Sequence, residues 1–325
     1  MYQSLPLDSL RNNSHIKNII PHSIGNVVWY GATHIPEEVE SKSTNLLFKV
    51  ILASIVIILA WCFLIPVSVY LPIIITVFSG LYISTAIGKG RGADYILGEN
   101  GFCIIQYKNY RHQIINIKNV LFDDVKYIFF GETRIYENEK YNRTEYTCSF
   151  YGKLVDDSYP LLYSKSGSFI EDDCFKGMEH KFFSDYIFFK EIEDIWNKIF
   201  VNSHGLDETA EFKVVEYALH KNTIANKLLD SFIKAKGIAS KSLSEKNLRT
   251  VTLTNDKLII DGTEYSLNCL KYTGINKGFL IVEHENHKRK LLGLADKGDI
   301  HSIQLNGLSN MKSFIAMFRY RMGDM

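Results

Sequence analysis

Hydrophobic residues are unevenly spread along the chain, and the longest apolar block comes early. From Val50 to Gly88, 39 consecutive residues carry no charge. One membrane crossing needs about 20 apolar residues, because the hydrocarbon core is ~30 Å thick and a helix rises about 1.5 Å per residue. Pro66 and Pro72, near the middle of the block, disfavour a continuous helix. The pattern therefore predicts a two-helix transmembrane hairpin over residues 46–88.

Charges on either side of this block predict its orientation. Lys42 and Lys49 precede the hairpin, Lys89 and Arg91 follow it, and the turn between the helices is uncharged. Since positive residues stay on the cytoplasmic side, we expect a multi-pass protein of the cell (inner) membrane with both termini in the cytoplasm. The uncharged interior favours an anchor over a transport pathway. The alternative is a hairpin buried in a large soluble core.

After the hairpin the pattern changes to short alternating segments. The stretch "DYILGENGFCIIQYK" predicts two strands joined by a tight turn at Asn100-Gly101. Further strands are expected near 120–130, 145–151 and 158–163, and apolar residues at helical spacing predict a helix over 185–200. Residues 94–204 therefore form the first predicted β domain, an antiparallel sheet closed by a C-terminal helix, after an N-terminal cytoplasmic segment at 1–45.

The same plan recurs at 249–325, after a predicted helical linker at 205–248. There "TVTLTNDKLIIDGTEYSL" reads as strands and turns, and "LSNMKSFIAMFRYRM" as a final helix capped by Ser309. The linker holds "TIANKLLDSFIKAKG", a predicted helix ending at Gly237. Two pairs of segments correspond between the domains, "YILGENGFCII" with "VTLTNDKLIID" and "DDVKYIFFG" with "NCLKYTGIN". We interpret the chain as carrying two copies of one fold.

A membrane hairpin, a Tyr-x-Leu-x-x-x-Gly motif, several strands and one helix resemble the bacterial pleckstrin-homology-like (PH-like) membrane proteins. The motif residues here are Tyr95, Leu97 and Gly101, and "VVWYGATHIPEE" matches the Trp-containing segment that precedes the spans. The resemblance implies a membrane-anchored α+β protein. It would have a two-helix transmembrane hairpin followed by two PH-like antiparallel β-barrel or sandwich domains, each closed by a C-terminal helix. It implies no catalytic residues. The tandem copy and the insertion "FIEDDCFKGMEHKFFS" depart from the family pattern.

Charge and cysteine content narrow the class of protein. The net charge of +1 argues against a nucleic-acid partner, although residues 206–325 carry 18 basic and 14 acidic side chains. Five scattered cysteines without a CxxC pair indicate a reducing compartment and argue against structural zinc.

The basic triplet Lys288, Arg289 and Lys290 is the candidate binding site for anionic lipid headgroups or a partner, with a solvated loop as the alternative. His284 and His287 lack the spacing of a helical metal motif, so no metal site is expected, and the stretch reads as a polar hairpin tip. Acidic groups at 123–124 and 171–173 read as solvated turns. With no phosphate-binding loop or nucleophile elbow, we expect neither catalytic residues nor a cofactor.

These observations predict a non-enzymatic, membrane-anchored binding or scaffold protein. Its PH-like domains would face the cytoplasm and recognise a protein, a peptide or an anionic lipid headgroup, and its partners would be the bilayer and a protein partner or further copies of the chain. The alternative is an oligomeric membrane effector whose hairpins assemble into a pore or perturb the bilayer. A hydrolase that uses His284 is a third hypothesis.

Overall fold

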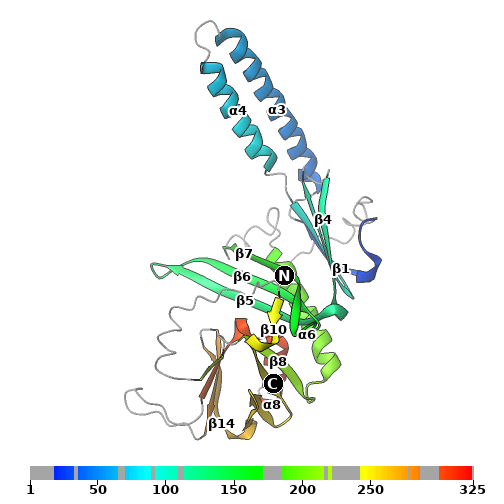
Figure 1. Cartoon of the computed structure of the whole chain (residues 1–325), viewed down its shortest axis with the longest axis vertical. Coiled ribbons are helices and arrows are strands. Elements are labelled where there is room, and N and C mark those ends of the chain that lie inside the picture. The colour runs from blue at the N-terminus through cyan, green and yellow to red at the C-terminus, as the bar shows by residue number, and fades with distance from the viewer. Residues whose placement is uncertain are drawn as a thin grey trace. The chain divides into compact units, whose positions relative to one another are not determined.

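The protein has an α+β fold built from antiparallel sheets and packed helices, seen in a computed structural model (Figure 1). The structure describes residues 18–32, 36–64, 70–88, 92–108, 113–170, 185–215, 219–221, 242–276, 278–285 and 300–323. Within these residues the strands form four sheets of four strands each. The predicted α+β class with antiparallel sheets is confirmed.

The chain divides into two compact units. Unit 1 comprises residues 1–119 with 174–185, and unit 2 comprises 120–173 with 186–325. Unit 1 holds the helical hairpin and most of the first sheet. Unit 2 holds the other three sheets and two further helices.

Two long helices form the hairpin of unit 1. They are α3 (Pro36–Leu64) and α4 (Tyr70–Gly88), which pack against each other side by side (Figure 1). The break between them falls at the predicted place, but α3 begins ten residues before the predicted boundary at 46. Its polar first turns are made of good helix formers, and proline is favoured at a first helical position. Among the described residues, no helix combines the length and apolar content that a membrane crossing requires.

The first sheet follows chain order. Its strands are β1 (Val27–Ala32), β2 (Gly92–Gly98), β3 (Gly101–Lys108) and β4 (Gln113–Leu121). The turn at Asn100 between β2 and β3 confirms the predicted hairpin. Strand β1, in the predicted N-terminal segment, was not expected to join the sheet, but Tyr30 pairs with Ile96 and both are fully buried. The helical hairpin is therefore an insertion between two neighbouring strands.

Unit 2 continues with a second sheet and a helix. These elements are β5 (Val125–Glu137), β6 (Lys140–Gly152), β7 (Ser158–Phe169) and α6 (Asp185–His204). The helix confirms the prediction from its apolar spacing, because Phe188, Ile192 and Trp196 are its buried face.

The C-terminal elements of unit 2 form two more sheets and the last helix. They are β8 (Ala210–Val215), β9 (Leu219–Lys221), β10 (Ser242–Ser244), β11 (Leu248–Leu253), β12 (Lys257–Ile260), β13 (Thr263–Ser266), β14 (Leu270–Asn276), β15 (Phe279–His284), β16 (Ile300–Gln304) and α8 (Met311–Met322). Strands β8 to β10 lie where a helical linker was predicted. Phe212 and Val214, two positions apart and so on one face of the strand, are fully buried, which explains β8; it pairs with β11. The helix predicted to end at Gly237 lies outside the described residues.

The two halves of the chain repeat one order of elements. The order β1-β2-β3-β4, then β5-β6-β7, then α6 is matched by β8-β11-β12-β13, then β14-β15-β16, then α8. Each half also has a long insertion between its first and second strands. The insertion at 33–91 holds the apolar hairpin, and the one at 216–247 holds β9 and β10.

Local geometry supports the same correspondence. A 3₁₀ helix precedes the fifth strand of each half, η2 (Phe122–Asp124) before β5 and η5 (Leu267–Cys269) before β14. The register then slips by one residue at Lys126 in β5 and at Lys271 in β14. This is the Lys-Tyr step that aligns in the two sequences, so a β-bulge sits at the same place in both halves.

Segments from the C-terminal half cover both edges of the β5-β6-β7 sheet. At one edge β10 pairs with β7, with Leu243 opposite Tyr159. At the other edge, Asn310 bonds to Ile128 of β5 twice: its backbone N–H donates to the Ile128 carbonyl at 2.7 Å, and its Oδ1 accepts from the Ile128 N–H at 3.0 Å. The two halves are thus interlocked within unit 2.

Asn310 and its neighbour Ser309 connect four elements. Asn310 Oδ1 also accepts from Trp196 Nε1 of α6 at 3.0 Å, and Ser309 Oγ accepts from the Lys213 N–H of β8 at 2.8 Å. Ser309 is therefore not the helix cap that the sequence predicted, because its hydroxyl is used by β8. Asn310 stands in the cap position in a left-handed conformation, and its side chain bonds away from the helix.

Candidate membrane-binding hairpin

The two helices of the hairpin meet along a line of small residues. Ala53 and Ala60 of α3 are seven positions apart, hence on one face, and both are buried, as is Pro72 of α4. A hydrogen bond crosses this contact from Trp61 Nε1 to Thr76 Oγ1, at 3.0 Å. Thr76 in turn donates to the Pro72 carbonyl at 2.8 Å, so its hydroxyl has both roles filled.

The hairpin also presents large apolar side chains to its surroundings. Among the residues whose side chains the structure describes, fourteen are exposed: Phe48, Ile51, Leu52, Ile55, Val56, Ile58, Leu59, Trp61, Tyr70, Leu71, Ile73, Ile74, Val77 and Phe78. Soluble proteins rarely expose a contiguous apolar surface of this size. Because the sequence contains no charge from Val50 to Gly88, no salt bridge can form on this surface. This surface is suited to an apolar environment, and between Val50 and Gly88 it has no charged side chain.

Only part of the predicted charged flank can be placed. Lys49 is an exposed residue of α3, and Lys42 lies earlier in the same helix. Lys89 and Arg91, on the far side of the hairpin, lie outside the described residues, as do Lys288, Arg289 and Lys290 of the predicted headgroup site. Of the predicted flanking and binding residues, the structure therefore places only Lys42 and Lys49.

Below the hairpin, the first sheet holds a buried carboxylate that the sequence analysis did not single out. Asp94 of β2 is 1% exposed, and the hydroxyls of Tyr30 and Tyr107 each donate to its Oδ1 at 3.4 Å. The three residues come from three adjacent strands. The sequence did offer one indication of this site, an aspartate at the start of an apolar strand. A carboxylate buried there requires hydrogen-bonding partners.

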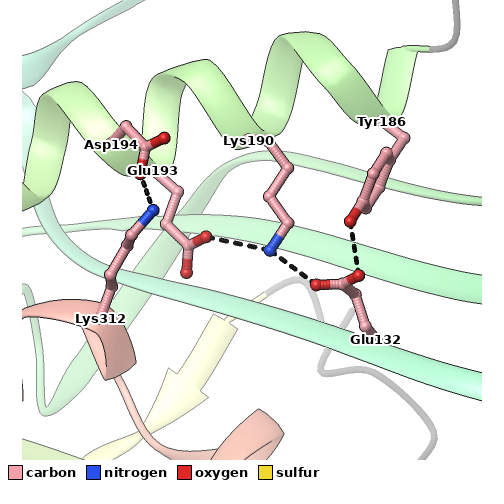
Figure 2. Close-up of polar contacts among 6 residues, drawn as sticks. All are labelled: Glu132, Tyr186, Lys190, Glu193, Asp194 and Lys312. Atoms are coloured by element: carbon pink, nitrogen blue, oxygen red, sulfur yellow. Dashed lines mark hydrogen bonds and ion pairs between the residues drawn. The ribbon is translucent and has the colours of Figure 1, made fainter. Parts of the chain in front are cut away.

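A second group of charges, in unit 2, fixes α6 on β5 (Figure 2). Lys190 Nζ lies 2.6 Å from Glu132 Oε2 and 3.4 Å from Glu193 Oε2, and 4.4 Å from the centre of the Phe130 ring. Tyr186 Oη donates to Glu132 Oε1 at 2.5 Å. Each carboxylate of the group therefore has a donor. The lysine is held between opposite charges and an aromatic face, so its ammonium group has partners on both α6 and β5.

The same group extends to the last helix. Lys312 of α8 pairs with Asp194 of α6 (Figure 2). Both side chains are close to half exposed, so this pair contributes at most about 1 kcal/mol. Sequence patterns could not show this group, since Glu132, Lys190 and Lys312 come from three separate elements.

Loss of the Glu193 proton with rising pH is expected to lower the free energy of unfolding of unit 2. Burial raises the pKa of the Glu193 carboxyl, and the nearby Lys190 charge only partly opposes this. The folded state therefore holds this proton to higher pH than the unfolded state, and stability falls as pH rises through that window. We expect Glu193→Gln to stabilise the protein by roughly 1 kcal/mol at pH 7, because it removes the cost of burying a charge and Lys190 keeps Glu132.

Denaturation curves at pH 4 and pH 7 measure this effect. The gain should be larger at pH 7 than at pH 4, because the raised pKa of Glu193 favours its neutral form as the pH falls. Glu191→Gln makes the same charge change on the same helix outside this group and is the control for the loss of a negative charge. A variant that loses stability at pH 7 would contradict this account of Glu193.

His284, which the sequence analysis placed at a polar hairpin tip, has different surroundings from those expected. His284 ends β15, where it pairs with Leu270, and is buried with its ring centre 4.4 Å from that of Tyr265. It is thus a core residue and not part of a polar tip, because the strand continues further than the charges suggested. His287 and the acidic triplet at 171–173 lie outside the described residues. In the described residues, no three His, Cys, Asp or Glu side chains converge as a metal site would require.

Comparison with known proteins gave no relative. No family model, no curated protein and no solved structure matches the chain. The functional assignment therefore depends on the geometry described above, of which the apolar hairpin is the most distinctive part.

Proposed function

We propose that this chain is a non-enzymatic, membrane-anchored binding or scaffold protein. The hairpin of α3 and α4 inserts into the lipid bilayer of the cell membrane, and both termini remain in the cytoplasm. The β domains, the first of which carries the hairpin between β1 and β2, have the PH-like plan and bind a protein, a peptide or an anionic headgroup. The repeated order of four strands, three strands and a helix supports the PH-like part of this proposal.

The exposed apolar surface of the hairpin carries the membrane assignment. Fourteen large side chains are roughly half exposed there, without a charge between Val50 and Gly88. At roughly 1 kcal/mol for each half-exposed side chain, moving this surface from water into lipid is favourable by on the order of 10 kcal/mol. That value is comparable with the whole stability of a domain, so we expect the hairpin to leave water.

Membrane fractionation tests the proposal. We expect the full chain to stay in the membrane pellet through carbonate and high-salt washes and to be released by detergent. Replacing residues 50–88 with a Gly-Ser linker should move it to the soluble fraction. Reporter tags at the two termini should be cytoplasmic, while a tag at Ser68 should be accessible from the opposite side only.

A matched pair of point variants sharpens this test. Ile55→Lys places a charge in the middle of α3, where insertion should lose about 3 kcal/mol, whereas Tyr70→Lys, at the hairpin turn, can reach the headgroups and should be tolerated. Equal behaviour of the two variants, or a full chain released by carbonate, would contradict insertion.

A second candidate function is an oligomeric membrane effector. Its support is Gly80 of α4, which is exposed and has open space where a side chain would project. A bare glycine on the outer face of an apolar helix allows a second helix to approach closely. Conductance of the purified chain across a planar bilayer would favour this candidate, whereas a silent, monomeric chain would dismiss it.

A further inference from the structure

The end of the first sheet nearest the hairpin is fixed by strand direction. Strand β1 ends at Ala32, four residues before α3, and β2 begins at Gly92, four residues after α4. Each connector has three residues, so the four Cα–Cα steps between strand and helix span roughly 14 Å at most. Because β2 and β3 are antiparallel, β3 ends on the hairpin side, at Lys108.

Strand β4 must begin on the same side. It neighbours β3 in the sheet and follows it after four residues, too few for the crossover that a parallel pair would need. The hairpin side of the sheet is therefore made by the ends of β1 and β3 and the starts of β2 and β4. Figure 1 shows this sheet directly beyond the open end of the two helices.

Exposure sets β4 apart from the strands beside it. Strands β2 and β3 are buried along nearly their whole length, whereas every residue from Gln113 to Asn119 is exposed. Among them, Ile114, Ile115 and Ile117 are 36%, 51% and 41% exposed. Three accessible isoleucines on an edge strand make an unusual surface, because edge strands are generally short, charged or covered. Lys108, at the end of β3, is also exposed.

We infer that this end of the sheet, Lys108 with Ile114 and Ile115, rests on an anionic lipid surface. The inference rests on the proposed insertion of the hairpin, which would hold this surface at the level of the headgroups. Isoleucines would enter the boundary between headgroups and acyl chains, and the lysine would reach the phosphates, as in other interfacial segments. One basic residue near such a surface contributes about 1 kcal/mol, enough to orient a sheet that is already anchored.

The bilayer is favoured over a second copy of the chain by position and charge. Lys108, Ile114 and Ile115 lie at the end of the sheet where β1 ends before α3 and β2 begins after α4, so an inserted hairpin would bring this end to the lipid surface without further docking. If two copies paired through their β4 strands, the contact would run along the whole strand and would not depend on Lys108.

Hydrogen exchange of the full chain in nanodiscs tests the inference. In nanodiscs with phosphatidylserine, amides in 113–117 should exchange about tenfold more slowly than in phosphatidylcholine nanodiscs. Lys108→Glu should remove this difference. Lys118→Glu makes the same charge change on β4, five residues or about 17 Å from the start of that strand at Gln113. This variant should keep the difference in exchange between the two lipids.

The outcomes separate the two proposals. Amides of 50–62 should be protected in both lipids; if they exchange freely, the inserted hairpin is wrong. Protected hairpin amides without a lipid-dependent effect at 113–117 would overturn this inference alone. Slow exchange at 113–117 that rises with protein concentration and ignores lipid charge would also overturn it, since that is the signature of paired copies.

Discussion

Replacing Asn310 with alanine is expected to lower the free energy of unfolding of unit 2 by about 2–6 kcal/mol beyond its matched control. The substitution leaves two buried donors, Ile128 N–H and Trp196 Nε1, without their acceptor. An unsatisfied buried donor costs roughly 1–3 kcal/mol, and Asn310 is only 4% exposed, so water cannot replace the lost oxygen.

The matched control is Asn138→Ala. Asn138 has φ of 51° against 48° for Asn310, so both substitutions place alanine in the same left-handed backbone conformation. Asn138 is exposed at the turn between β5 and β6, where its donors and acceptors meet water. The difference between the two variants, measured by denaturant unfolding in detergent, therefore isolates the buried hydrogen bonds.

A less destabilising variant tests the same hydrogen bonds if Asn310→Ala does not fold. Trp196→Phe removes one donor and leaves both bonds between Asn310 and Ile128 intact, so it should cost only about 1–2 kcal/mol, counting the lost bond and slightly poorer packing. If Asn310→Ala and Asn138→Ala were equally stable, the connection between β5, α6 and α8 would contribute nothing and the interlocking described above would be wrong.

A fragment of residues 205–325 is expected not to fold cooperatively, although it contains the complete second copy of the repeated plan. Three of its apolar residues share a buried cluster with side chains of the first half. The cluster consists of Tyr127, Phe129, Tyr151, Tyr159, Val215, Leu243 and Leu248. Burying Val215, Leu243 and Leu248 is worth about 1.5–3 kcal/mol each, hence roughly 5–9 kcal/mol together.

That loss equals most of the stability of an ordinary domain, and the fragment also leaves Asn310 without Ile128 and Trp196. The control is residues 120–325, which restore β5, β6, β7 and α6. Circular dichroism during thermal unfolding should show a cooperative transition for 120–325 and none for 205–325. A cooperative transition in the shorter fragment would show that the two halves are independent domains.

Local patterns predicted most elements of this fold. The Asn100-Gly101 turn, the apolar spacing of 185–200 and the run from Val50 to Gly88 each depend on neighbours within one or two turns of chain. At these places the structure has a strand-to-strand turn, a helix and a pair of packed helices. The Lys-Tyr steps at 126–127 and 271–272 also coincide with bulges, at Lys126 in β5 and at Lys271 in β14.

Long-range pairing was the part that local patterns could not supply. Nothing near Asn310 indicates that it bonds to Ile128, 182 positions away. The strands within 205–248 were missed for a related reason, since β9 and β10 have three residues each and exist as strands only against β16 and β7. Ser309 has the sequence context of a helix cap, but β8 uses its hydroxyl.

The position of the hairpin between β1 and β2 has a mechanical consequence. The chain leaves the sheet from one strand and returns through its direct neighbour, at the same end. A pull on the hairpin therefore draws both strands in one direction, and their mutual hydrogen bonds are not sheared. The load passes instead to the contacts of β2 with β3, which hold both strands to the remainder of the sheet. A tether placed at a chain terminus would load a single strand and could peel it from the edge.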